Sequence, residues 1–254
     1  MSKFLKFFDN NEQRSTYELS EQYITPYVSA IKGTNGGGVE PRYNIPSDIL
    51  CVLTLKDNST VYITGEETLS RDDIYPYNQD VVRAIITNRC TSIGDATFLE
   101  CQSLSSVTLS NNITKLKIAT FRQCISLEHI TLLNTLKELD SYVFYGSGLK
   151  ELIIPEGVTK IKGGVISSCP NLESVTFHSS IEDLSGSQFL TNCNKLREIK
   201  IIGIKDMTNI ISFNRYNIGL KSDLTLYVDS SLVDVYKAQR DRFDGLYKIL
   251  PLEQ

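Results

Sequence analysis

The sequence predicts a β-rich (α/β) solenoid, a fold in which one short unit of structure repeats along an axis. The chain from Val81 to Asp223 divides into similar units, which begin at Val81, Leu104, Leu127, Leu149, Leu172 and Leu196. The first five units are 22 to 24 residues long, and the last is 28. A regular period of this length is typical of stacked solenoid repeats. We therefore expect about six coils over residues 81–223.

Each unit has the same apolar skeleton. Counted from the first residue of a unit, positions +3 and +5 are apolar, as in Val107/Leu109, Ile130/Leu132, Leu152/Ile154, Val175/Phe177 and Ile199/Ile201. This alternation predicts one short parallel strand per unit, with one buried face. Position +17 is large and apolar in every unit: Phe98, Phe121, Phe144, Ile166, Phe189 and Phe213. One unit cannot bury this row alone, so we expect neighbouring coils to stack.

A second shared feature surrounds position +17. Residues 91–98 read TSIGDATF and are followed by Cys101-Gln102-Ser103-Leu104, and Ala119-Thr120-Phe121 is followed by Cys124-Ile125-Ser126-Leu127. This pattern resembles the BspA-like subclass of leucine-rich repeats. The resemblance implies a leucine-rich-repeat solenoid that binds other proteins. The third unit departs from the pattern, with Gly146-Ser147-Gly148 where its neighbours have cysteine.

The cysteines recur with the repeat. Cys101, Cys124, Cys169 and Cys193 lie at +20 or +21 of their units. We interpret them as a ladder of small buried thiols, because a free cysteine behaves as a small hydrophobe. The sequence has no CxxC pair and no cysteine–histidine cluster, so it predicts no metal site.

Both ends of the repeat array are predicted to be capped. Residues 49–55 and 60–64 alternate around the turn-rich segment 56–59, which predicts a β-hairpin. This hairpin, with a polar connection over residues 66–79, forms a predicted N-terminal cap over residues 47–80. A strand at 224–228 and a helix over 229–238, capped by Ser230 or Ser231, form a predicted C-terminal cap over residues 224–254. Leu232, Val233 and Tyr236 would supply the apolar stripe of that helix, and this ending also resembles the C-terminal cap of BspA-like domains.

Residues 1–46 are predicted to be an anchoring arm with a linker at Gly36-Gly37-Gly38. Its aromatic residues are the candidate assembly contacts, through which oligomerisation is also possible: Phe4, Phe7, Phe8, Tyr17, Tyr23 and Tyr27. Residues 6–10, 23–31 and 43–44 are similar to the N-termini of proteins from tailed phages of gut bacteria, the crAss-like group among them. That resemblance implies a virion protein that assembles in the host cytoplasm.

Composition excludes several classes of partner. A net charge of −4 gives no general attraction to nucleic acid or to an anionic membrane, and no run of 18 apolar residues predicts membrane insertion. The opening residues have too short an apolar core for a signal peptide. The two histidines, His129 and His178, belong to no recognisable catalytic motif. We therefore expect no enzymatic activity and no cofactor.

The outward face of the predicted strands is the candidate binding surface. Positions +2, +4 and +6 point away from the buried row, and solenoids of this kind use such a face for contact. The candidate contact residues are His129, Thr131, Glu151, Ile153, Thr176, His178, Glu198 and Lys200. A threonine ladder also suits a pleated surface that binds nothing, so strand propensity is an alternative explanation for this row.

Two functions follow from these patterns. The first is a structural or interaction protein of a phage virion, capsid- or tail-associated, with the arm as an anchor and the solenoid used for host attachment or as a spacer. The second is a BspA-like adhesion or protein-binding module at a bacterial cell surface. The lack of a recognisable secretion signal favours the first.

Overall fold

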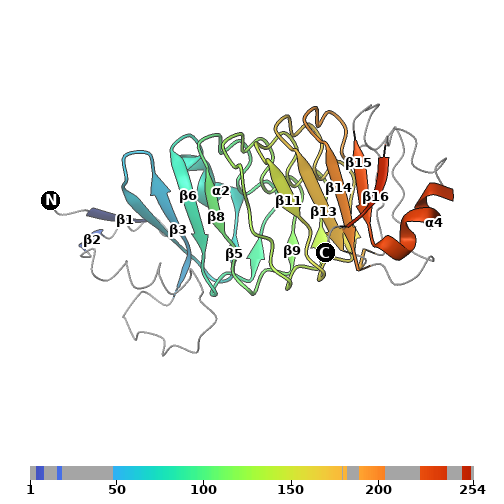
Figure 1. Cartoon of the computed structure of the whole chain (residues 1–254). Helices are drawn as coiled ribbons and strands as arrows, with labels where there is room; N and C mark the ends of the chain where they lie inside the picture. The colour runs from blue at the N-terminus through green and yellow to red at the C-terminus, as the bar shows by residue number, and fades with distance from the viewer. Residues whose placement is uncertain are drawn as a thin grey trace.

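The computed structural model describes residues 48–178, 180–181, 189–203, 224–238 and 248–252, and the backbone of 4–8 and 16–18. The coils lie side by side along one axis, with β1 (Phe4–Phe8) near one end and α4 (Val233–Ala238) at the other (Figure 1). We number them coil 1 (81–103), coil 2 (104–126), coil 3 (127–148), coil 4 (149–171), coil 5 (172–195) and coil 6 (from 196). The predicted solenoid is confirmed, as a β-solenoid with little helix rather than an α/β fold.

One strand per coil was predicted along the first face, and most of these strands are present. They are β6 (Val81–Ile86), β8 (Ser106–Thr108), β11 (Glu151–Ile153), β13 (Ser174–His178) and β14 (Glu198–Ile202). Coil 3 is the exception, because residues 128–133 form no strand. Thr131 is exposed and Leu132 is buried there, so the alternation in burial is present without the ladder of hydrogen bonds. The alternation of apolar residues predicts which side chains are buried. It does not predict whether the backbone of the segment forms hydrogen bonds with a neighbouring strand.

A second set of short strands lines another flank of the coils. It consists of β7 (Ser92–Ile93), β9 (Lys115–Leu116), β10 (Glu138–Leu139) and β12 (Lys160–Ile161). The last three pair in parallel as a three-stranded sheet in the order β12-β10-β9. Leu116, Leu139 and Ile161 are buried, while the residues on either side of them are charged and, apart from the buried Asp140, at least partly exposed. This arrangement follows from the apolar residue at position +12.

The third flank is a turn that repeats two left-handed backbone positions. Position +15 has φ of 53° to 71° at Ala96, Ala119, Tyr142 and Gly164. Position +19 has φ of 57° to 69° at Glu100, Gln123, Gly146 and Ser168. Alternate N–H groups of this turn donate to carbonyls of the next coil, for example Phe98 to Thr120 at 2.9 Å and Phe121 to Val143 at 2.8 Å. The turn thus builds its own ladder between coils without strand geometry.

The core contains the predicted residues at position +17. The rings of Phe98 and Phe121 stack with centroids 5.4 Å apart, and those of Phe121 and Phe144 with centroids 5.8 Å apart. Ile166 ends this stack at coil 4. The cysteines are buried and free, as predicted. The Cys124 thiol of coil 2 donates to the Phe98 carbonyl at 3.1 Å, and Cys169 of coil 4 and Cys193 of coil 5 make the same contact with Phe144 and Ile166.

At the N-terminal end, β3 (Ile49–Leu55) and β4 (Thr60–Thr64) form the predicted antiparallel hairpin, and β3 pairs with β6. The predicted connection over 66–79 is more structured than expected. It contains β5 (Thr68–Leu69), α2 (Arg71–Ile74) and the 3-10 turn η1 (Tyr75–Tyr77), because Leu69 and Ile74 are buried in the core. β5 pairs in parallel with β7, so this segment extends the solenoid by part of a coil.

Part of the predicted arm lies in strands. β1 pairs in parallel with β4 and antiparallel with β2 (Thr16–Glu18), so Phe4, Phe7, Phe8 and Tyr17 belong to the sheet that contains the hairpin. Tyr23, Tyr27 and the glycine linker lie outside the described residues.

At the C-terminal end, β15 (Thr225–Val228) continues the parallel sheet and β16 (Lys248–Pro251) adds a strand that the sequence did not predict. The helical segment begins with η2 (Ser230–Leu232) and continues as α4. Its N-cap is Asp229 rather than a serine, because the Asp229 carboxylate accepts from the Ser231 N–H at 2.9 Å. Tyr236 is buried as predicted. Phe213 and the rest of 204–223 lie outside the described residues.

Candidate functional site

The candidate site lies on the sheet formed by β11, β13, β14, β15 and β16. These five strands are parallel and in register, so side chains from successive strands form rows across the sheet. One row runs Ile153, Thr176, Lys200, Tyr227, Leu250. Because residues at alternate positions, such as Leu152 and Val175, are buried in the core, this row faces away from it. The row is named the outer row below.

The outer row is apolar at its ends and amphipathic in the middle. Ile153 is 56% exposed and Leu250 is 40% exposed. The Lys200 ammonium lies 5.8 Å from the centre of the Tyr227 ring, within the range of a cation–π contact. Thr176 is a correction to the predicted contact set. It faces outward but is only 9% exposed, as expected for a small side chain with Ile153 and Lys200 on the strands either side of it.

A polar row runs beside the outer row. It consists of Glu151, Ser174, Glu198, Thr225 and Lys248. Glu198 Oε2 lies 3.0 Å from Lys200 Nζ, so this carboxylate ties the two rows together. Glu151 Oε1 lies 3.6 Å from His129 Nδ1, which links coil 4 to coil 3. The sheet therefore presents an apolar strip with a charged border.

The predicted histidines occupy different parts of this face. His129 and Thr131 are exposed on the segment of coil 3 that forms no strand. His178 is half-buried at the end of β13, where it pairs with Ile202. The structure thus joins Glu151, Ile153, Thr176, Glu198 and Lys200 in one sheet, and it places His129 and Thr131 beside that sheet.

Sequence reasoning missed two residues of the outer row. Tyr227 lies at an outward position of a strand that was predicted, and applying the same alternation to residues 224–228 would have found it. Leu250 lies in β16, next to Pro251, and proline argues against a strand. No pattern in the sequence identifies that strand, because it lies beyond the last repeat, although it pairs with β15 and buries Ile249 in the core.

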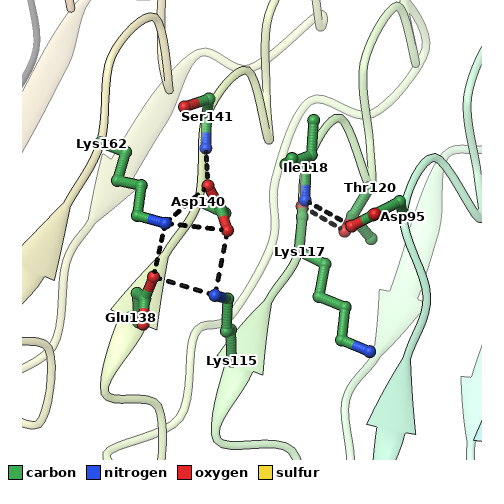
Figure 2. A network of polar contacts seen from close by, with 9 residues as sticks. All are labelled: Asp95, Lys115, Lys117, Ile118, Thr120, Glu138, Asp140, Ser141 and Lys162. Carbon is green, nitrogen blue, oxygen red and sulfur yellow. Dashed lines mark hydrogen bonds and ion pairs between the residues drawn. The ribbon is translucent and has the colours of Figure 1, made fainter.

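The three-stranded sheet on the second flank carries an ionic network instead (Figure 2). Lys115 Nζ lies 2.9 Å from Glu138 Oε1 and 3.0 Å from Asp140 Oδ2, and Lys162 Nζ lies 3.1 Å from Glu138 Oε1 and 3.2 Å from Asp140 Oδ1. The hydrogen bond from Lys115 is the main reason that the pKa of Glu138 lies below its usual value. Burial works to raise the pKa of Asp140, but hydrogen bonds from Lys115, Ser141 and Lys162 outweigh it and lower that pKa.

This network joins three consecutive coils by charge. Coil 2 contributes a lysine, coil 3 two carboxylates and coil 4 a lysine, so each carboxylate lies between two cations. Within the described part of the chain, no three His, Cys, Asp or Glu side chains are grouped as metal ligands. No helix in the same residues has the length and apolar character needed to cross a bilayer.

Comparisons with known proteins agree with the coil geometry. Residues 73–197 match the family described as BspA type leucine rich repeat region, in six copies. The solved structure of the pneumococcal vaccine antigen PcpA is 26% identical, with a TM-score of 0.55 over 68% of this chain. The match spans 42% of the PcpA chain.

Two further solved structures are more distant. A leucine rich repeat protein of T. pallidum is 20% identical, with a TM-score of 0.44, and the match covers 51% of this chain and 71% of that one. A leucine-rich repeat protein of Bacteroides ovatus ATCC 8483 is 16% identical, with a TM-score of 0.40, over 99% of this chain and 76% of that one. No curated protein matches. The predicted repeat class is confirmed, and residues 73–197 are a leucine-rich repeat region of the BspA type.

Proposed function

We propose that this protein is a non-enzymatic protein-binding module of the adhesion type and that the outer row is its contact surface. The observation that carries this proposal is the combination of exposed Ile153 and Leu250 with the Lys200–Tyr227 pair on one flat sheet. Interface cores are enriched in aromatic and apolar groups, with charged residues at their rim. The outer row supplies the core of such an interface, and Glu151, Glu198 and Lys248 supply its rim.

The rigidity of the sheet supports the same function. The outer row is built on backbone pairs between strands, and the opposite faces of those strands are buried at Leu152, Val175, Ile199 and Leu226. A surface whose strands are paired with one another and packed on the core loses little conformational freedom when a partner binds. Leucine-rich repeat regions of this class act as interaction modules, which agrees with a site on the outward face of a five-stranded sheet.

The two ends of the molecule act as caps in this proposal. An uncovered solenoid end exposes an unpaired strand edge, which invites aggregation. The β3–β4 hairpin pairs with β6 at one end, and β16 with α4 lies beside β15 at the other. Capped ends direct association to the sheet face rather than to the edges.

The role in a phage virion stays a prediction that rests on the resemblance of residues 1–46. The same holds for anchoring through the arm, for oligomerisation through it and for location in a virion rather than at a bacterial surface. The similarity to PcpA, a vaccine antigen, and the repeat type support the adhesion function over the virion role.

Site-specific photocrosslinking tests the proposed contact surface. A photoreactive benzoylphenylalanine would replace Ile153 or Leu250 in the full chain, and Thr114 or Lys137 as controls, which are exposed on the other flanks. After exposure to intact bacterial or host cells and irradiation, the outer-row probes should capture a discrete protein that the control probes do not. Equal capture from all four positions, or capture from the controls only, would contradict the proposal.

A further inference from the structure

A second surface stands out on the turn flank of coils 2 and 3. It consists of Ile118, Arg122, Tyr142 and Tyr145, which we name the Tyr–Arg patch. Tyr142 is 45% exposed and Ile118 is 44% exposed, and the backbone of the two residues is adjacent because the Ala119 N–H donates to the Ser141 carbonyl at 3.0 Å. The patch lies outside the outer row, and neither the repeat nor the proposed function uses it.

The aromatic and cationic groups of the patch are arranged by mutual contact. Tyr142 and Tyr145 pack edge to face with ring centres 5.8 Å apart, and the Arg122 guanidinium lies 5.1 Å from the centre of the Tyr145 ring. Arg122 Nε is buried and has no hydrogen-bond partner. Among the described residues, no carboxylate lies within ion-pair distance of Arg122. The guanidinium is therefore positioned by the Tyr145 ring rather than by an ion pair, which leaves its ion-pairing capacity unused.

The nearby carboxylates are either committed elsewhere or out of reach. Asp95 accepts from the Ile118 N–H at 3.2 Å, and Asp140 is held by Lys115 and Lys162 (Figure 2). Glu100 is exposed on coil 1, and its N–H donates to the Arg122 carbonyl, yet its side chain makes no ion pair with Arg122. Arginine and tyrosine are enriched among the residues that contribute most to the binding energy of protein interfaces.

The patch also departs from the pattern of the repeat. Its left-handed position +15 holds small residues in the neighbouring coils, namely Ala96, Ala119 and Gly164, but Tyr142 in coil 3 at φ 62°. A bulky side chain in this region of the backbone is uncommon, and such residues occur often at binding sites. A tyrosine here places an aromatic ring on a turn that the fold builds from alanine or glycine.

We propose that the Tyr–Arg patch binds an acidic peptide segment of a partner protein. A carboxylate of the partner pairs with the terminal nitrogens of Arg122, and apolar side chains next to that carboxylate pack on Tyr142 and Ile118. Arginine and carboxylate form a charge-assisted, two-point contact, and the guanidinium already lies over the Tyr145 ring. The partner segment is thus expected to carry an acidic residue, which complements the charge of Arg122, next to an apolar residue.

Selection from a random peptide library displayed on filamentous phage tests this proposal with the full chain as bait. The first variant is Arg122→Gln, which removes the cation and keeps much of the side chain. The second is Tyr142→Gly, which removes the ring at a backbone position that suits glycine, as Gly164 shows one coil later. The matched control is Ala119→Gly, the same backbone change in coil 2 with no loss of an aromatic ring.

The expected outcome is an enriched peptide family with Asp or Glu beside an apolar residue. A synthetic member of that family should bind Arg122→Gln and Tyr142→Gly about tenfold more weakly than wild type, and Ala119→Gly within about twofold, with circular dichroism unchanged. Raising the salt concentration should weaken binding to wild type but not to Arg122→Gln. Enrichment of neutral or basic peptides, no enrichment, or equal binding by both variants would overturn the proposal. Binding of dextran sulfate in place of any acidic peptide, lost in Arg122→Gln, would assign the patch to an anionic polysaccharide and also overturn it.

Discussion

Coils 1–3 and the strands from coil 4 onward stack by different means, although both come from one repeat. In coils 1–3 the contacts between coils run through the stacked rings of Phe98, Phe121 and Phe144, the hydrogen bonds of the turn flank and short strand pairs such as β6–β8 and β9–β10. From β11 to β16 they run through a five-stranded parallel ladder. The strand series is interrupted between these regions, at residues 128–133. The repeat therefore specifies burial in each coil, while the hydrogen bonds between coils differ along the array.

The comparison also separates two kinds of surface. Where the ladder is wide and regular, the outer row can carry apolar side chains such as Ile153 and Leu250 on a flat face. Where the ladder is interrupted, aromatic groups gather on the turn flank instead, at the exposed Tyr142 and the half-buried Tyr145.

The substitution with the largest expected effect on stability interrupts the stack of phenylalanine rings. Phe121→Ala removes the middle ring, which contacts both neighbours, and should lower the free energy of unfolding by about 3–5 kcal/mol, as for other buried aromatic residues. Hydrogen exchange should lose protection in coils 1–3 and keep it in β13, β14 and β15, because contacts reach only adjacent coils. Uniform loss of protection over the whole chain would show that the two regions unfold as one.

A smaller effect tests the close approach of coils 2 and 3. A Cβ at Gly148 would lie 2.1 Å from the Ile125 carbonyl oxygen, so Gly148→Ala should force the two coils apart and cost about 1–3 kcal/mol. Gly94→Ala is the control, because the nearest atom to its Cβ would lie 3.4 Å away. Urea unfolding measures the difference in stability between the two variants. Equal midpoints would mean that coils 2 and 3 can separate near Gly148 without loss of stability.

The smallest effect concerns the ionic network of the three-stranded sheet. Lys115→Met should cost about 1 kcal/mol at neutral pH, since this lysine is one-third exposed and screened by solvent. The pKa values of Glu138 and Asp140 are lowered in the folded protein, so their contribution is present above the unfolded values near about 4 and is lost as the pH falls through the folded values. Urea midpoints of wild type and variant should differ at pH 7 and converge toward pH 3. A constant difference would contradict the ionic origin.

Much of the fold follows from the sequence because burial leaves a periodic pattern. The hairpin strands at 49–55 and 60–64 agree with β3 and β4 residue for residue, and the apolar residues at +17 are buried wherever the structure describes them. The missing strand in coil 3 could not be predicted, since residues 128–133 carry the same alternation as the other coils and differ only in their hydrogen bonds. The added β16 could not be predicted because its segment lies beyond the last repeat and ends at a proline.

The candidate site was predicted in part for the same reason. Alternation places Ile153 and Lys200 outward, but the 9% exposure of Thr176 depends on the size of its neighbours on other strands. The sequence does contain a pattern that indicates the ionic network. Position +11 reads Lys115, Glu138, Lys160 and position +13 reads Lys117, Asp140, Lys162, so the sign of the charge alternates from coil to coil.

The affinity of the outer-row double variant Ile153→Glu/Leu250→Glu for the protein captured by the crosslinking probes tests the central claim most directly. Both side chains are exposed, so the variant should keep the circular dichroism spectrum and the melting temperature of wild type. Its affinity should fall at least about tenfold, because two apolar contacts become charged. The control Thr114→Glu/Lys137→Glu on the other flanks should bind as wild type does. A folded outer-row variant with unchanged affinity would contradict the assignment of the strand face as the binding surface.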